Sequence, residues 1–278
     1  MAPFKEILSC DELGQDRFRF AAVPSELPRT FGGQVVAQAL MAAARTVAAE
    51  YPVHSVHGYF LAPGRPDEPS EHQVIRIRDG GSFRVRQVNV VQADRPIFTM
   101  TASFHRGDEG FSHQIGMPQE LTPDEIAELD LVSGRTMRRL PDWHDWEMRL
   151  APRPADAAPV PAVQRLWIRH VPPLPDDPVQ HACALAYLSD MAMLRAARLP
   201  HPRRAIQGAS LDHAIWFLRP VRVDQWLLYD QASPSAELGR ALTQGRLFDA
   251  RGALVAVTTQ EGVFRIDRTA PADIPQRK

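Results

Sequence analysis

Residues 31–48 read FGGQVVAQALMAAARTVA and predict a helix that carries no charge before Arg45. Thr30 is its expected N-cap. Its apolar side chains recur at every fourth position, at Phe31, Val35, Ala39, Ala43 and Val47. A helix on the surface of a globular protein carries many charges, so we expect other structure to wrap around this one.

Residues 178–196 read PVQHACALAYLSDMAMLRA and predict a second buried helix, with Asp177 as its N-cap and Pro178 in the first position. Residues 183–188 are apolar on all sides of this helix, and its first charge is Asp190. A carboxylate within a buried helix costs several kcal/mol unless it is hydrogen-bonded, paired or protonated. Asp190 is therefore the first residue that calls for a functional explanation.

Strands are predicted after each helix, separated by turn residues such as Asp79-Gly80-Gly81. The predicted strands span residues 54–61, 72–78, 82–91, 97–106, 209–218, 226–233, 238–248 and 253–265. The sequence YFLAP at 59–63 matches WFLRP at 216–220, and residues 96–103 match residues 253–260. These matches indicate an internal duplication. Each copy would be a long helix against a curved antiparallel sheet, which is an α+β fold.

A proline-rich segment separates the two copies. Eleven of the 25 prolines lie between Pro118 and Pro178, which favours a connection over core structure there. Thr122-Pro123-Asp124-Glu125 has the pattern of a capping box and predicts one short helix within this segment. We therefore expect an N-terminal unit at 1–113, a linker with a short helix at 114–145, and a C-terminal unit at 146–278.

The composition limits the classes of function. The 278 residues contain 32 Lys and Arg against 33 Asp and Glu, a balance that argues against nucleic acid as a partner. No apolar run approaches the ~20 residues of a membrane span, and no secretory signal peptide is visible. The two cysteines, Cys10 and Cys183, cannot form a disulfide framework. A cytoplasmic protein without a membrane partner is the expectation.

Common catalytic motifs are missing from the sequence. It has no Gly-x-Ser-x-Gly, Gly-x-Gly-x-x-Gly or Walker-type motif. His54 and His57 lie three residues apart on a predicted strand, on opposite faces, so a shared metal ion is not expected. Cys183 is interpreted as a buried structural thiol, with a nucleophilic role as the less favoured alternative.

Several motifs together resemble the acyl-CoA thioesterase II family. They occur in order along almost the whole chain, as FGGQVVAQAL at 31–40, HSVHGYFL at 54–61, RDGGSF at 78–83, MTASF at 100–104, WIR at 167–169, LSD at 188–190, SLDHAIWF at 210–217 and TQEGV at 259–263. The resemblance implies a double hotdog fold and hydrolysis of acyl-CoA to free fatty acid and CoA, with neither a metal nor a cofactor. The family's catalytic Asp, Thr or Ser, and Gln fall here on Asp190, Ser210 and Gln260.

These three residue types suit the chemistry that the resemblance implies. Asp190 would activate a water or orient it, while Ser210 and Gln260 would hold the water or the thioester carbonyl. We hypothesise that a backbone N–H of Gly32 or Gly33, at the start of the first helix, binds the developing oxyanion. An alternative is that these two glycines only permit close packing.

Other interpretations remain open at this point. Asp212 is a second candidate carboxylate, and His213, which faces the other side of a strand, is expected to pack or form hydrogen bonds. An enoyl-CoA hydratase or dehydratase, or an acyl-CoA-binding protein without catalysis, is an alternative function. A homo-oligomer is plausible because curved sheets leave edges to cover.

Overall fold

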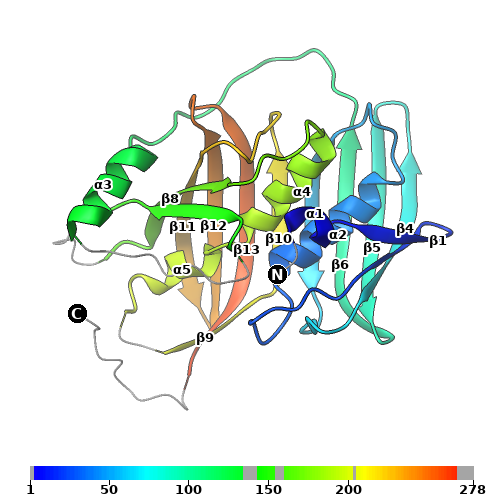
Figure 1. The fold of residues 1–278 in the computed structure, drawn as a ribbon, viewed down its shortest axis with the longest axis horizontal. Coiled ribbons are helices and arrows are strands. Elements are labelled where there is room, and N and C mark those ends of the chain that lie inside the picture. The colour runs from blue at the N-terminus through cyan, green and yellow to red at the C-terminus, as the bar shows by residue number, and fades with distance from the viewer. Residues whose placement is uncertain (1–2, 134–142, 154–159, 203–204, 268–278) are drawn as a thin grey trace.

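Two neighbouring helices lie against one face of a large curved sheet (Figure 1). The structure is a computed structural model that describes residues 3–133, 143–153, 160–202 and 205–267. The helices are α1 (Phe4–Ile7), α2 (Gly32–Ala44), α3 (Pro123–Ser133), α4 (Pro178–Ser189) and α5 (Met193–Arg198). The strands are β1 (Cys10–Gly14), β2 (Arg17–Phe20), β3 (Val53–Phe60), β4 (Ser70–Asp79), β5 (Phe83–Gln92), β6 (Arg95–His105), β7 (Trp146–Leu150), β8 (Val163–His170), β9 (Ile206–Ser210), β10 (Asp212–Phe217), β11 (Leu227–Glu237), β12 (Arg240–Asp249) and β13 (Leu254–Ile266).

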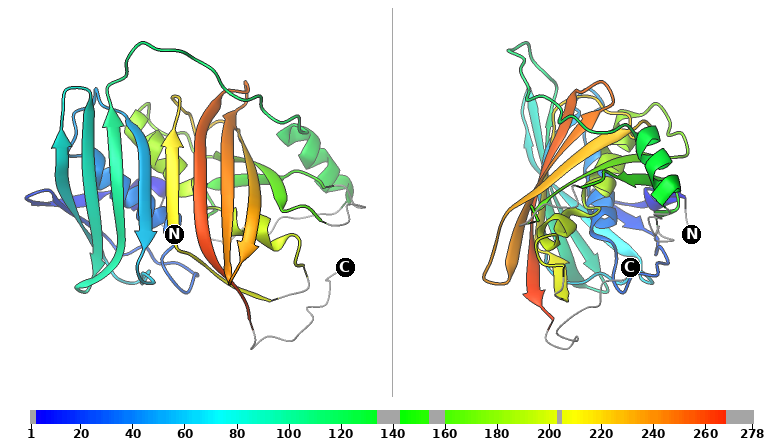
Figure 2. Two further views of the ribbon diagram at one scale, coloured as in Figure 1. Left: turned by 180° about the vertical axis from the view of Figure 1, so that it is seen from behind. Right: turned by 90° about the vertical axis from the view of Figure 1, so that its left-hand side faces the viewer.

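One continuous sheet joins the two halves of the chain. Its strand order is β1-β2-β4-β5-β6-β3-β10-β13-β12-β11-β8-β7, and β9 pairs with β13 outside this path. The halves meet where β3 and β10 pair in antiparallel register, with Gly58 opposite His213 and Val56 opposite Ile215. Seen from behind, these strands run side by side across the middle of the sheet (Figure 2). The sheet therefore brings residues from both halves to a single centre.

The two central helices pack against each other and fill the core. Their apolar side chains are buried, including Val36 and Leu40 of α2 and Leu185 and Leu188 of α4. This burial on all sides explains why both helices lack the charges of a surface helix. The predicted α+β class, with one long helix against an antiparallel sheet in each half, is confirmed. Among the described residues, no helix combines the length and the apolar character that crossing a membrane requires.

The start of α2 and the end of α4 differ from the prediction. Phe31, not Thr30, occupies the N-cap position of α2, and no side chain caps this helix. Asp177 caps α4 as predicted, since its carboxylate accepts from the Val179 N–H at 2.9 Å. The second helix, however, stops at Ser189 and does not continue to residue 196, because Ala192 has a left-handed φ of 62° before α5 begins. Asp190 is consequently a helix C-cap and not an interior residue.

The proline-rich middle contains more regular structure than predicted. Its short helix is observed as α3, where the Thr122 N–H donates to Glu125 Oε2 at 2.7 Å in a capping box. The strands β7 and β8 also lie here and bury Trp146 and Ile168, so this part of the segment is core. The predicted strand 209–218 is divided into β9 and β10 at Leu211. The unit boundaries after residues 113 and 145 stay predictions, and linker residues 134–142 lie outside the described residues.

Candidate active site

The N-terminus of α2 meets the C-terminus of α4 at the Asp190 carboxylate. The Gly33 N–H donates to Asp190 Oδ2 at 2.9 Å. A helix N-terminus has free N–H groups and a partial positive charge, both of which favour an anion. Because α2 has no side-chain cap of its own, Asp190 of the other helix serves this function. The contact holds the carboxylate at a fixed place between the two halves.

The strands β9 and β13 bring the two other predicted catalytic residues beside Asp190. Ser210 is paired with Gly262, two residues beyond Gln260 on β13. The Ser210 hydroxyl lies 3.5 Å from Asp190 Oδ1, and Gln260 Nε2 donates to Ser210 Oγ at 2.6 Å. The first distance is long for an O–H···O hydrogen bond, so the Ser210 hydroxyl is not committed to the carboxylate. The three residues that the resemblance implied thus lie together in space.

The surroundings of Asp190 make it a stronger base than an ordinary aspartate. Burial disfavours the charged form and raises the pKa of Asp190, although His213, Gln260, the Gly33 N–H and Ser210 act in the opposite direction. Desolvation is the largest of these effects. A carboxylate with a raised pKa accepts a proton more readily, which is what a general base requires.

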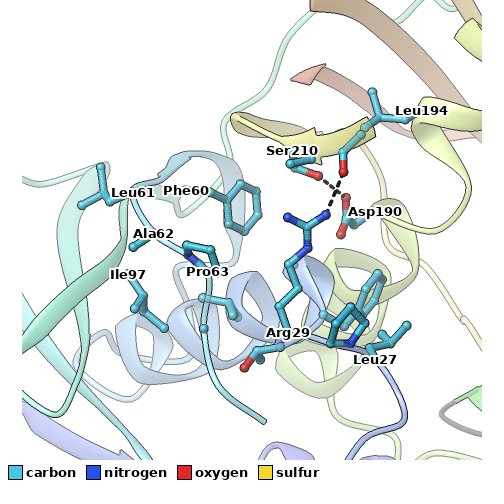
Figure 3. Close-up of a pocket in the computed structure, with 18 of the residues that line it drawn as sticks. Leu27, Arg29, Phe60, Leu61, Ala62, Pro63, Ile97, Asp190, Leu194 and Ser210 are labelled. Carbon is cyan, nitrogen blue, oxygen red and sulfur yellow. Dashed lines mark hydrogen bonds between the residues drawn. The ribbon is translucent and has the colours of Figure 1, made fainter. Parts of the chain in front are cut away.

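A cavity of about 430 Å³ opens beside the carboxylate. Figure 3 shows Asp190 and Ser210 at one side of it and Phe60, Ala62 and Ile97 at the other. Most of its wall is apolar, and Gly32 also lines it. Such a cavity, with few polar groups at one end, is suited to an apolar chain attached to a reactive polar group.

Arg29 reaches into the mouth of this cavity. Its Nη2 donates to the Gly208 carbonyl oxygen of β9 at 2.7 Å (Figure 3). The Arg29 side chain is exposed, and the structure assigns no ion pair between its guanidinium and a carboxylate among the described residues. No motif in the sequence singles out Arg29, because only folding brings it to β9.

The two glycines that open α2 have different surroundings. The Gly33 N–H is occupied by Asp190, whereas the Gly32 N–H has no acceptor among the residues that the structure describes. A Cβ on Gly33 would lie 2.2 Å from the Tyr187 carbonyl oxygen, and one on Gly32 would lie 2.7 Å from Asp190 Oδ2. Close packing is therefore a role of both glycines, and Gly32 alone keeps a free donor beside the cavity.

Asp212 and His213 point to opposite faces of the sheet, as expected for neighbours on a strand. Asp212 lies on the outer face, where its Oδ2 is 3.2 Å from His57 Nε2 and its Oδ1 accepts from the Glu261 N–H. His213 is fully buried on the inner face and contacts Gln260 and Ser189. Asp212 is thus absent from the cavity wall, and its candidacy as an alternative base is not supported.

A cysteine nucleophile and a metal site, the two chemistries that the sequence disfavours, have no support in the described residues. Cys183 is fully buried in α4, and burial raises the pKa of its thiol, which disfavours a nucleophilic thiolate. Within the described ranges, His, Cys, Asp and Glu side chains form no group of three that could hold a metal ion.

Two protein-family models match the chain. The model described as acyl-CoA thioesterase N-terminal domain matches residues 23–105, and the model described as acyl-CoA thioesterase matches residues 144–263. Acyl-coenzyme A thioesterase 8 of Homo sapiens is 36% identical over 280 residues, which cover 94% of this chain and 88% of the human protein.

Solved structures give the same result. The acyl-CoA thioesterase II TesB2 from Mycobacterium marinum superposes with a TM-score of 0.84 at 45% identity, covering 96% of this chain and all of that protein (100%). A hot dog fold protein of unknown function from Alicyclobacillus acidocaldarius is 23% identical, with a TM-score of 0.79 over 95% of this chain and 98% of its own. This second likeness concerns the fold, and it supports the double hotdog that the family resemblance implied.

Proposed function

The chain belongs to the acyl-CoA thioesterase family and is a thioester hydrolase of acyl-CoA, and from this premise we propose that Asp190, Ser210 and Gln260 direct the attack of a water molecule on the thioester. The observation that supports this most is the contact of the three side chains with one another, with Asp190 and Ser210 on the wall of the apolar cavity and Gln260 buried behind Ser210. No covalent enzyme intermediate is required, because a thioester carbonyl is electrophilic enough for an activated water.

The reaction can be followed atom by atom. Asp190 takes a proton from the water as the water oxygen bonds to the thioester carbon, and the carbonyl oxygen becomes an oxyanion. When the carbon–sulfur bond breaks, the carbonyl re-forms as a fatty acid and CoA leaves as a thiolate. Asp190 then gives the proton that it took from the water to the thiolate, which leaves as the thiol of CoA. Ser210 and Gln260 position the water through neutral hydrogen bonds and exchange no proton themselves.

Gly32 is the best-placed donor for the oxyanion. Its N–H lies at the positive end of α2, beside the cavity, and is not used by another described group. The Gly33 N–H instead binds Asp190. Gly32 would therefore stabilise the negative charge on the substrate, and Gly33 would orient the base. The sequence left open whether Gly32 or Gly33 binds the oxyanion. We assign the oxyanion to the Gly32 N–H and the orientation of Asp190 to the Gly33 N–H.

The cavity also indicates how the substrate lies. The acyl chain would occupy the apolar part around Phe60 and Ile97, with its thioester beside Asp190. The CoA portion would then leave through the mouth, where the exposed Arg29 offers a cation to its phosphates. The partner that we propose is thus a small molecule, acyl-CoA, and the chemistry needs neither a metal nor a cofactor.

The alternative functions have less support in the structure. A hydratase would need an acid and a base that converge on the substrate, but Asp212 and His213 lie on opposite faces of β10. An acyl-CoA-binding protein without catalysis would have no need for a base in the cavity. A test of this last alternative is the release of free thiol from acyl-CoAs of graded chain length, since a binding protein would release none.

Replacing Gln260 with alanine is expected to lower kcat for thiol release about a hundredfold, with little change in KM. The amide donates to Ser210 Oγ at 2.6 Å and orients a hydroxyl that lines the cavity, but it is not itself part of the apolar wall that would hold the acyl chain. Gln244→Ala, the same change on the exposed face of the neighbouring strand, is the matched control. Equal rates for Gln260→Ala and Gln244→Ala would contradict the role of Gln260.

Location and assembly stay predictions. Both cysteines are free thiols, which is typical of proteins in a reducing compartment and agrees with the cytoplasmic location expected from the sequence. A homo-oligomer is suggested by exposed aromatic side chains on the outer face of the central strands, Tyr59 at 54% and Trp216 at 44% exposure.

A further inference from the structure

The amide of Gln260 has a second partner on the side away from Ser210. His213 Nδ1 lies 2.7 Å from Gln260 Oε1, and His213 Nε2 lies 2.7 Å from Ser189 Oγ. Gln260 is 1% exposed, and His213 and Ser189 are fully buried, so water does not compete for these contacts. The catalytic amide is thereby held between one residue of the site and a histidine behind it.

The orientation of this amide decides whether it presents a donor or an acceptor to Ser210. A Gln side chain rotated by half a turn occupies the same space but exchanges its N–H donors for a carbonyl acceptor. In one orientation Gln260 donates to Ser210, which leaves the Ser210 hydroxyl proton free for Asp190 or for the water. In the other orientation Gln260 would accept that proton, and Ser210 could no longer donate toward Asp190.

We propose that His213 is a positioning residue of the thioesterase, which fixes the orientation of the Gln260 amide by donating from Nδ1 to Oε1. The contacts then form one ordered series, in which His213 donates to Gln260, Gln260 to Ser210, and Ser210 toward Asp190. The Ser189 hydroxyl lies between two acceptors, the Ala186 carbonyl oxygen at 2.8 Å and His213 Nε2 at 2.7 Å, and the proposal requires its proton to be on the His213 side. Every proton in this series points toward the carboxylate, whose negative charge favours that order.

The series returns to the helix from which it started. Ser189 is the last residue of α4, and Asp190 follows it directly, so the peptide bond between them closes the network into a ring. Burial lowers the pKa of His213, which favours the neutral imidazole. In a neutral imidazole one nitrogen is a donor and the other an acceptor. In the proposed tautomer Nε2 accepts from the Ser189 hydroxyl, and Nδ1 carries the proton that it donates to Gln260.

Two amide substitutions separate the two nitrogens of His213. The side-chain nitrogen of asparagine occupies nearly the position of Nδ1, so His213→Asn keeps a donor to Gln260. The amide of glutamine reaches the position of Nε2, so His213→Gln keeps a contact with Ser189 and loses the donor to Gln260. In His213→Asn the Ser189 hydroxyl keeps a partner, because the Ala186 carbonyl oxygen is already within hydrogen-bond distance in the wild type.

The test measures kcat, KM and melting temperature for His213→Asn, His213→Gln, Gln260→Ala and the double variant His213→Gln/Gln260→Ala. We expect His213→Gln to lower kcat about thirtyfold and His213→Asn to stay within about fivefold of wild type, with KM little changed in both. Because His213 acts only through Gln260, the double variant should be no slower than Gln260→Ala. His72→Gln, at a fully buried histidine of the other half that contacts Ser70, should lower the melting temperature without lowering kcat.

Two results would overturn the inference. One is an equal loss of kcat in His213→Asn and His213→Gln. Such a result would mean that catalysis depends on the imidazole as a whole and not on its Nδ1 donor. The other is a double variant that is slower than Gln260→Ala by the full factor of His213→Gln. The inference rests on the proposed role of Gln260, and the two fail differently, because a wild-type rate in Gln260→Ala would contradict that role directly.

Discussion

Replacing Asp190 with asparagine is expected to lower kcat for thiol release about a thousandfold. The amide has nearly the same shape and can still accept the Gly33 N–H, which donates to Asp190 Oδ2 at 2.9 Å in the wild type. It cannot accept a proton from water. The acyl chain binds the apolar wall around Phe60 and Ile97, so KM should change little. The measurement is steady-state thiol release with a long-chain acyl-CoA.

The same variant should not be less stable than the wild type. Because the pKa of Asp190 is raised in the folded protein, its ionised form costs folding free energy above that pKa, and this cost disappears as pH falls below the ordinary aspartate value. Asp190→Asn should therefore melt at an equal or higher temperature under slightly alkaline conditions, with the difference shrinking in acid. Asp212→Asn is the matched control, and it should keep its kcat, because Asp212 lies on the outer face. A variant at Asp190 that turns over normally would refute the assignment of the base.

Replacing Gly33 with alanine is expected to destabilise the protein by about 3 kcal/mol and to lower kcat at least tenfold. The added Cβ would lie 2.2 Å from the Tyr187 carbonyl oxygen, which is backbone of α4 and cannot move without the helix. The two helices must therefore separate, and the Gly33 N–H would leave Asp190. Thermal melting and thiol release measure the two effects.

A glycine with open surroundings supplies the control for this prediction. Gly81 has no atom within 4 Å of the position that its Cβ would take, and Gly81→Ala should leave the melting temperature nearly unchanged. If Gly33→Ala were as stable and as active as Gly81→Ala, the close contact of α2 with α4 would have no role in holding the base.

The residues of the site were predicted from the sequence by two different kinds of information. Asp190 is recognisable by itself, because it is a charge inside a helix that the sequence predicts to be buried. Ser210 and Gln260 are ordinary strand residues, and only the family resemblance drew attention to them. Their contact depends on the pairing of β9 with β13, which brings together residues 50 positions apart in the sequence. Patterns of neighbouring residues in the sequence do not reveal which distant strands pair.

One detail of the predicted duplication was out of register. The match of residues 96–103 with 253–260 places Ser103 on Gln260, but Ser103 belongs to the less buried face of β6, and Gln260 faces the core. A shift of one residue moves a side chain to the other face of a sheet. The core-facing neighbours of Ser103 are Ala102 and Phe104, which are apolar. The first half therefore has no polar group like Gln260, and only the second half supplies the catalytic side chains.

The end of the second helix could not be predicted either. The sequence at Ala192 has no glycine or proline to mark the break, and the helix pattern continues to residue 196. The left-handed conformation of Ala192 is set by tertiary contacts, since the Ala192 carbonyl oxygen accepts from Gln164 of β8. Asp190 gains its place at the helix end, facing Gly33, from this break.

The dependence of kcat/KM on pH, compared between the wild type and Asp190→Asn, tests the role of Asp190 as the base most directly. Only the carboxylate can accept a proton, so the wild-type rate should fall toward acid with a midpoint above the ordinary aspartate value of about 3.9, as the raised pKa requires. His213, the other titratable group of the network, has a pKa that burial lowers, and because it is present in both proteins its titration would affect both profiles. The residual rate of Asp190→Asn should not show the fall. The same fall in the variant, or a wild-type midpoint at the ordinary aspartate value, would contradict the account.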